Sequence, residues 1–195
     1  MDLTEGPYRS YGLDMTATTS PTSESLGDLL TLIRAATTAR DNWTEAAARV
    51  ESALEGHLPA PCGLLGREGA NAGHRLETRV LHTEPDGTFS VVALSCPPGK
   101  ATAIHDHVTW CVFAVVAGTP LEERFVLDEA GTALMPAGGS VRTTRSVSGG
   151  APPGDIHRLS NPGPQTAVSL HVYGTDVSRI GSSVRRTYDL PIITP

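Results

Sequence analysis

Apolar residues recur at helical spacing in the first third of the chain. Steps of three, four and seven residues predict a helix that begins near Leu26. A second helix is predicted for residues 42–54. Residues 1–24 are rich in Thr, Ser, Gly and Pro and lack apolar periodicity, so we expect a flexible N-terminal tail before the helices.

From about residue 75 the pattern changes to short runs typical of β-strands. These runs cover residues 75–82, 89–95, 110–117, 121–127 and 167–173. Turns rich in Pro and Gly separate them. The pattern predicts an all-β fold, a small barrel or sandwich, over residues 75–195. The helices and loop of residues 25–74 would pack outside it, within the same domain.

Composition narrows the class of protein. The 195 residues include 15 Lys and Arg against 21 Asp and Glu, a net charge of −6. Without a basic run, we expect neither nucleic acid nor a membrane surface as partner. No apolar stretch approaches the roughly 18 residues that span a bilayer. Three cysteines without a CxxC motif favour a reducing cytoplasm, and a monomer is the default expectation.

The segment His105-Asp106-His107 is the first candidate for chemistry. Alternate residues of a strand point to the same face, so both imidazoles would face the interior and could bind one metal ion. Asp106 would then face the other way. The alternative is a pair of solvent-facing histidines.

Glycines at fixed distances surround this pair. Gly99 precedes His105 by six residues, and Gly118 follows His107 by eleven. This spacing resembles the first signature of the cupin superfamily. Cys111 stands where cupins usually carry a glutamate ligand.

A second signature of the same superfamily follows in the expected order. Pro152, Gly154, His157 and Asn161 match its end, which identifies His157 as the third candidate ligand. Three neutral imidazoles would leave a divalent ion with its full charge and with open positions for a soft anionic ligand such as a thiolate. Zinc with three histidine ligands is the alternative on geometry alone.

The last predicted strand narrows the resemblance from the cupin superfamily to one family within it. Ser169, His171 and Tyr173 alternate, so all three would face the same interior. Together with the segments 104–110 and 154–161, this row resembles the cysteine dioxygenase family of type I thiol dioxygenases, which has the cupin fold.

The resemblance implies a role for each residue. His105, His107 and His157 would hold iron(II). Tyr173 would place its phenol near dioxygen or the substrate thiolate, and His171 would orient Tyr173 with Ser169 as its partner. The implied reaction inserts both atoms of O2 into a small thiol and yields a sulfinate, with the thiol supplying the electrons.

Arg79 is the candidate for substrate binding. In mammalian-type members of the family an arginine 26 residues before the first ligand histidine binds the substrate carboxylate, and Arg79 has that spacing. A guanidinium suits a bidentate carboxylate contact. Arg79 favours L-cysteine as the substrate, whereas Glu77 departs from the family pattern. The arginines after the last strand, Arg179, Arg185 and Arg186, are rival anion clamps.

Cys111 raises the question of a covalent modification. Mammalian-type members carry a cysteine here that forms a thioether with the active-site tyrosine, so the resemblance implies a Cys111–Tyr173 cross-link. The strand is one residue shorter after His107 than in that pattern, which leaves the cross-link open.

Three functional hypotheses remain. The first is an iron(II) thiol dioxygenase acting on L-cysteine, and the second is the same chemistry on 3-mercaptopropionate or another pathway-specific thiol. The third is a non-oxidising cupin that binds metal and a small molecule as a sensor. The row of His171 and Tyr173 favours catalysis.

Overall fold

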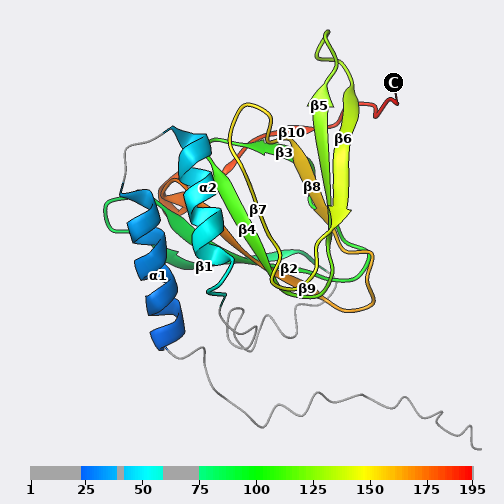
Figure 1. Cartoon of the computed structure of the whole chain (residues 1–195). Helices are drawn as coiled ribbons and strands as arrows, with labels where there is room; N and C mark the ends of the chain where they lie inside the picture. The colour runs from blue at the N-terminus through cyan, green and yellow to red at the C-terminus, as the bar shows by residue number, and fades with distance from the viewer. Residues whose placement is uncertain (1–22, 39–41, 59–74, 195) are drawn as a thin grey trace, which may run out of the picture.

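Two helices precede a β-rich region in the computed structural model, which describes residues 23–38, 42–58 and 75–194 (Figure 1). The helices are α1 (Ser23–Thr37) and α2 (Trp43–Leu54), and a short α4 (Val177–Ile180) lies between the last two strands. The strands are β1 (Glu77–Thr83), β2 (Ser90–Cys96), β3 (Ile104–His107), β4 (Cys111–Ala117), β5 (Leu121–Leu127), β6 (Leu134–Val141), β7 (Val147–Gly150), β8 (His157–Ser160), β9 (Ala167–Tyr173) and β10 (Val184–Tyr188).

The strands form two five-stranded sheets. One has the order β1-β2-β9-β4-β7 and the other β10-β3-β8-β5-β6, and neighbouring strands pair antiparallel throughout. Strands of both sheets line one cavity, so the sheets face each other across it. This architecture confirms the all-β fold that the sequence predicts.

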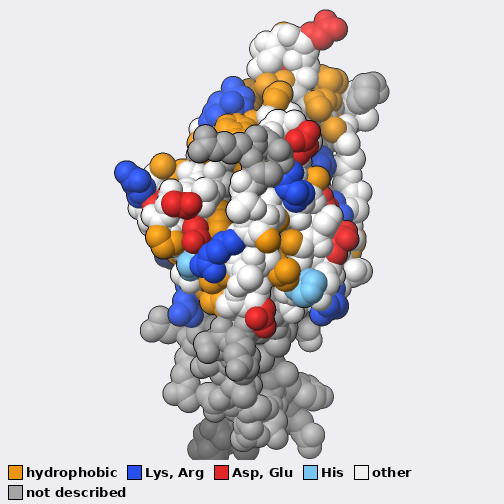
Figure 2. All heavy atoms as spheres, turned by 60° about the vertical axis from the view of Figure 1, so that its left-hand side comes forward, with side chains coloured by type: hydrophobic (Ala, Val, Ile, Leu, Met, Phe, Trp, Pro, Cys, Tyr) orange, Lys and Arg blue, Asp and Glu red, His pale blue; other side chains and the backbone are white. Residues whose placement is uncertain are grey.

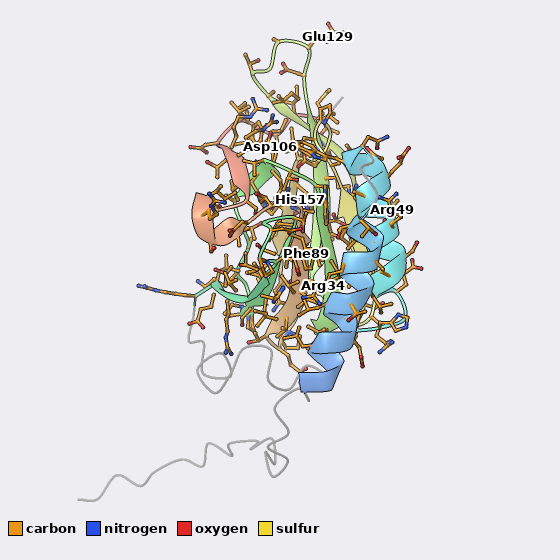
Figure 3. The ribbon with its side chains drawn as sticks, turned by 90° about the vertical axis from the view of Figure 1, so that its left-hand side faces the viewer. Arg34, Arg49, Phe89, Asp106, Glu129 and His157 are labelled. Carbon is orange, nitrogen blue, oxygen red and sulfur yellow. The ribbon has the colours of Figure 1, made fainter. Side chains whose placement is uncertain are left out.

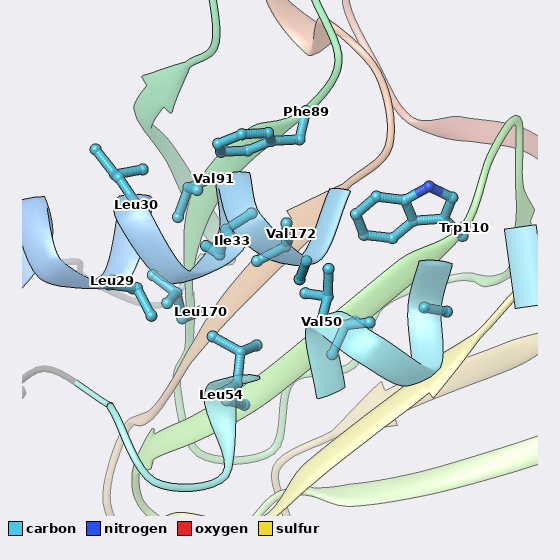
Figure 4. Close-up of a cluster of buried hydrophobic side chains, with 14 of the residues drawn as sticks. Leu29, Leu30, Ile33, Val50, Leu54, Phe89, Val91, Trp110, Leu170 and Val172 are labelled. Atoms are coloured by element: carbon cyan, nitrogen blue, oxygen red, sulfur yellow. The ribbon is translucent and has the colours of Figure 1, made fainter. Parts of the chain in front are cut away.

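The first sheet is covered by the two helices on its outer face. Strand β2 is therefore buried on both faces, and every one of its residues is buried. Val91 of β2 lies beside Leu30 and Ile33 of α1 in the largest apolar cluster of the described residues (Figure 4), which also includes Ala93. Full burial of each large aliphatic side chain contributes about 1.5–3 kcal/mol. The helices thus pack outside the sheets, as the sequence predicts.

The helix boundaries follow local capping chemistry. Asn42 precedes α2, and its side-chain oxygen accepts a hydrogen bond from the backbone N–H of Glu45 at 3.0 Å, which is the preferred N-cap arrangement. Helix α1 begins at Ser23, three residues before the predicted start at Leu26. The expected tail at residues 1–24 falls almost entirely outside the described residues, as does most of the expected loop before residue 75.

Gly118 shows why a glycine follows β4. Its φ is +78°, a conformation that side chains rarely adopt, and a Cβ there would lie 2.8 Å from Cα of Ala167. The turn can therefore pass directly beside the start of β9. This explains physically the last glycine of the first cupin signature.

Several elements are not evident in the sequence pattern. Strands β7 and β8 have four residues each, and β6 is mostly exposed and contains Gly138 and Gly139. Such strands depend on pairing with their neighbours more than on apolar alternation. Within the described residues, no helix is long and apolar enough to cross a membrane. Figure 2 shows acidic and basic side chains interspersed over one face.

Candidate active site

Three histidines converge in the interior from the second sheet. His105 and His107 lie on β3, His157 lies on β8, and the register pairs His105 directly with His157. All three are buried, and one ring nitrogen from each lies within 4.8 Å of the others. Figure 3 places His157 inside the molecule. The predicted ligand set is therefore assembled at one point.

Each of these rings has a hydrogen-bond acceptor at Nδ1. Nδ1 of His105 lies 2.9 Å from the carbonyl of Ala103, and Nδ1 of His107 lies 3.1 Å from Asp155. Nδ1 of His157 lies 3.4 Å from Glu122. Because Nδ1 donates in every case, the lone pair of each ring is at Nε2, as metal ligation requires.

The protonation state also suits a metal ion. Burial, with the nearby His157 as the second cause, lowers the pKa of His105 to about 4. Burial lowers the pKa of His157 as well, against the opposing effect of Glu122. Neutral imidazoles are the form that binds metal. The donor set therefore fits a divalent transition metal such as iron(II) or zinc.

Glu122 is a site residue that sequence analysis missed. Its side chain is buried on β5, beside His157, and accepts hydrogen bonds from Arg124, Arg142 and Ser148. Burial opposes its ionisation, but the contacts with His157 and the arginines outweigh this and lower its pKa. An ionised carboxylate thus contacts Nδ1 of His157, the third candidate ligand. Only the pairing of β5 with β8 brings it there.

Asp155 was missed as well, although it lies inside the second signature. Its carboxylate accepts from the backbone N–H of His107 at 2.9 Å and from Nδ1 of the same residue. Burial would raise its pKa, but these two hydrogen bonds lower it overall. Asp155 therefore fixes both the backbone and the ring of His107.

The facing sheet contributes the row of Ser169, His171 and Tyr173. The Ser169 hydroxyl lies 2.8 Å from Nε2 of His171, and the Tyr173 hydroxyl lies 3.4 Å from Nδ1 of the same ring. Burial lowers the pKa of His171 to about 3. The rings of Tyr173 and His107 are 5.8 Å apart between centroids. The neutral imidazole of His171 thus lies between the Ser169 hydroxyl and the Tyr173 phenol. The phenol in turn lies beside the histidine cluster.

Cys111 lies directly opposite Tyr173 on the neighbouring strand β4. Both side chains are on the interior face, and Cys111 is buried. Burial raises the pKa of the Tyr173 phenol, and Cys111 raises it further. Burial likewise raises the pKa of the Cys111 thiol. The shorter segment after His107 therefore does not carry the sulfur away from the tyrosine.

A cavity of about 260 Å³ opens between the sheets beside these residues. Three of the histidines and the tyrosine contribute to its wall: His105, His157, His171 and Tyr173. Drug-sized ligands occupy pockets of roughly 300–1,000 Å³. The cavity therefore suits a small molecule.

Arg79 does not lie at this cavity, contrary to its predicted role. Thr78 and Val80 line the cavity, and side chains alternate along a strand. Arg79 pairs in register with Ala93, which packs on the helix side of the sheet. Arg79 has the expected spacing to His105, but the alternation of side chains along β1 directs its guanidinium to the opposite face of the sheet.

The alternative arginines after β9 also lie outside the cavity wall. Arg185 and Arg186 both donate to Asp106, together with the hydroxyl of Tyr188. Asp106 thus faces away from the histidine cluster, as strand alternation predicts. Arg179 is exposed on α4 and is not part of the cavity wall.

Several solved structures resemble this chain. One is the cupin domain of an XRE family transcriptional regulator from Enterobacter cloacae, with 16% identity and a TM-score of 0.36 over 50% of this chain and 93% of that one. A cupin 2 conserved barrel domain protein from Salinispora arenicola has 19% identity and a TM-score of 0.38 over 56% and 82%. Recombinant oxalate oxidase in complex with glycolate has 18% identity and a TM-score of 0.43 over 54% and 53%.

A family match covers the β-rich region. The sequence model of the family described as cysteine dioxygenase type I matches residues 70–186, more than half of the chain. The matched range contains the three converging histidines and the row on β9.

Proposed function

Because the chain belongs to the cysteine dioxygenase type I family, we propose that it is a non-haem iron(II) thiol dioxygenase that converts a small thiol to its sulfinate. The observation that carries the proposal is the meeting of two groups: three Nε2 donors from one sheet and a Ser-His-Tyr row from the other. The cavity between them has room for a small substrate.

Iron(II) fits the donor set. Bound by His105, His107 and His157, it would supply the redox chemistry that joins a thiolate to dioxygen, with the thiol as the source of electrons. The protein holds the three rings in the correct tautomer. Asp155 and Glu122 do so for two of them, and removal of such supporting acceptors commonly weakens metal binding by about 10–100-fold.

The row of Ser169, His171 and Tyr173 on β9 orients the hydroxyl of the Tyr173 phenol. When Ser169 donates to Nε2 of His171, the Nδ1–H of that ring faces the Tyr173 oxygen. The phenol proton is then available to a ligand in the cavity. Since burial raises the pKa of Tyr173, the phenol stays protonated at neutral pH and acts as a donor.

The substrate is a small thiol. The expectation of L-cysteine rested on a carboxylate contact with Arg79, and that side chain lies on the other face of β1. L-Cysteine and 3-mercaptopropionate therefore remain candidates without an assigned carboxylate partner. The two described cysteines, Cys96 and Cys111, are free thiols, as suits an enzyme of the reducing cytoplasm.

Oxygen uptake by the iron-loaded protein tests the function. With a panel of small thiols, at least one should produce sulfinate in proportion to dioxygen consumed. His157→Ala should lose both iron and turnover, because a ligand is removed. Tight iron binding without oxygen uptake on any thiol would instead favour the non-oxidising, metal-binding cupin.

A further inference from the structure

Two arginines share the carboxylate that supports the third candidate ligand. Arg124 and Arg142 both form ion pairs with Glu122, and Oε1 of Glu122 also lies 3.4 Å from Nδ1 of His157. Resting on the function proposed above, we infer that Arg142 is a positioning residue for the metal. It limits the negative charge that Glu122 presents to His157, and it thereby raises the reduction potential of the bound iron.

The two oxygen atoms of Glu122 have different partners. Oε2 accepts hydrogen bonds from Nε of Arg142 at 2.8 Å, from Nη2 of the same side chain and from the Ser148 hydroxyl at 3.0 Å. Oε1 accepts from Nε of Arg124 at 3.2 Å and lies beside Nδ1 of His157. The shortest contacts of this carboxylate are therefore with Arg142, and its contact with the imidazole is the longest.

Asp155 provides a comparison within the same site. Its Oδ2 lies 3.1 Å from Nδ1 of His107, and among the described residues no arginine forms an ion pair with it. A carboxylate behind a ligating histidine raises the basicity of the ring. Asp155 exerts this effect with its full charge, whereas the charge of Glu122 is shared with two guanidinium groups. The two rings therefore differ as electron donors.

Burial makes the pairing of Glu122 with Arg142 effective. The exposed fraction of the side chain is 2% for Glu122 and 24% for Arg142, so solvent and salt screen this pair less than a surface pair. Drawing negative charge away from Glu122 weakens its hydrogen bond with Nδ1–H of His157 and makes the ring a poorer electron donor. A poorer donor favours iron(II), because iron(III) carries one more positive charge.

The position of Arg142 is fixed by contacts on two sides. Its backbone N–H donates to the carbonyl of Pro120 at 2.7 Å, and Nη2 of its guanidinium donates to the Ser148 hydroxyl at 3.0 Å. Ser148 lies on β7 of the first sheet, whereas Glu122 lies on β5 of the second. Arg142 therefore joins the two sheets beside Glu122. It is not part of the wall of the substrate cavity.

Redox titration of the iron-loaded protein, followed by the EPR signal of iron(III), measures the effect without turnover. Arg142→Gln should shift the ratio of iron(III) to iron(II) at a fixed potential about tenfold toward iron(III), or about 59 mV for a one-electron couple. Arg124 still pairs with Glu122 in this variant, so the buried carboxylate keeps a partner. Arg142→Lys retains the positive charge and should recover most of the wild-type potential.

An unchanged potential in Arg142→Gln would overturn the inference. A protein that binds no iron would instead contradict the proposed function, on which the inference rests. The two failures are therefore distinguished by the iron content of the wild type, measured before the titration.

Two further variants separate this effect from a general loss of positive charge. Arg158 follows His157 on β8 but pairs with Glu123, so Arg158→Gln removes the same charge and should leave the potential close to that of the wild type. In a Glu122→Gln background, Arg142→Gln should add little, because the carboxylate through which it acts is gone. An equal shift in Arg158→Gln, or a full shift in the double variant, would overturn the inference.

Discussion

At the scale of single residues, the hydrogen-bond acceptors at Nδ1 of the histidines orient the rings of the proposed metal ligands. Glu122 supports His157 from a buried position, whereas its neighbour Glu123 pairs with Arg158 outside the cluster. The two carboxylates are adjacent in sequence and differ in role because strand side chains alternate. They therefore form a matched pair for mutation.

Glu122→Gln should weaken iron binding by about 10–100-fold, because the amide no longer holds the ring of His157 with a negative charge. Glu123→Gln should leave iron affinity unchanged. Competition with a chelator of known affinity measures both variants. Equal affinity in the two would show that Glu122 does not support the ligand.

Tyr173→Phe should retain iron, because no ligand is lost, but slow sulfinate formation by one to several orders of magnitude. Each factor of ten corresponds to about 1.4 kcal/mol in the activation free energy. Iron content and single-turnover rates measure the two effects separately. An unchanged rate would exclude the phenol from the chemistry.

Cys111 and Tyr173 lie opposite each other with both side chains in the interior, so we expect a thioether to form in part of the protein during turnover. Intact mass should then show a fraction that lacks two hydrogens. Cys111→Gly should show no such fraction. An unmodified wild-type mass after many turnovers would leave Cys111 as a packing residue.

Glu122, which sequence analysis missed, reaches the site in a different way from the three histidines that it found. His105, His107 and His157 belong to local motifs whose spacing alone indicates their chemistry. Glu122 has no such motif, since only the β5–β8 pairing brings it to His157. Arg79 was misplaced because β1 is an exposed edge strand, where no apolar alternation reveals which face points inward.

At the scale of elements, the apolar pattern located the five strands of seven residues each. The predicted runs at 121–127 and 167–173 coincide with β5 and β9. Strand β10 was not predicted, because its residues are mostly polar and exposed. It is held to β3 by Asp106, which binds Arg185 and Arg186.

A pH-dependent contact joins α1 to the end of β1. Arg34 and His82 both contact the carboxylate of Glu84 at 3.0 Å. The hydrogen bond from Arg34 is the main cause of a lowered Glu84 pKa, with burial opposing it. A lowered pKa stabilises the fold above the unfolded value of 4.5, and this contribution is lost as the pH falls through the folded value.

Glu84→Gln should therefore lower the free energy of unfolding by about 0.2–1 kcal/mol at pH 7, the range for partly exposed ion pairs. The difference from wild type should shrink as the pH falls below about 4.5. Urea unfolding at a series of pH values measures it. A difference that stays constant with pH would show that the carboxylate charge is not responsible.

At the scale of the whole molecule, the two sheets contribute different groups to the candidate site. The second sheet provides the proposed metal ligands through β3 and β8, and the first provides the Ser-His-Tyr row and Cys111 through β9 and β4. Helices α1 and α2 cover the outer face of the first sheet (Figure 1). The cavity between the sheets is where a thiol would meet both groups.

The central claim is that both atoms of one dioxygen molecule enter the thiol at this cavity. The most direct test is mass spectrometry of the product formed by the iron-loaded protein under ¹⁸O₂ in unlabelled water. The account predicts a sulfinate with both oxygen atoms labelled, formed by the wild type and not by His157→Ala. A product with unlabelled oxygen, or a disulfide in place of the sulfinate, would contradict it.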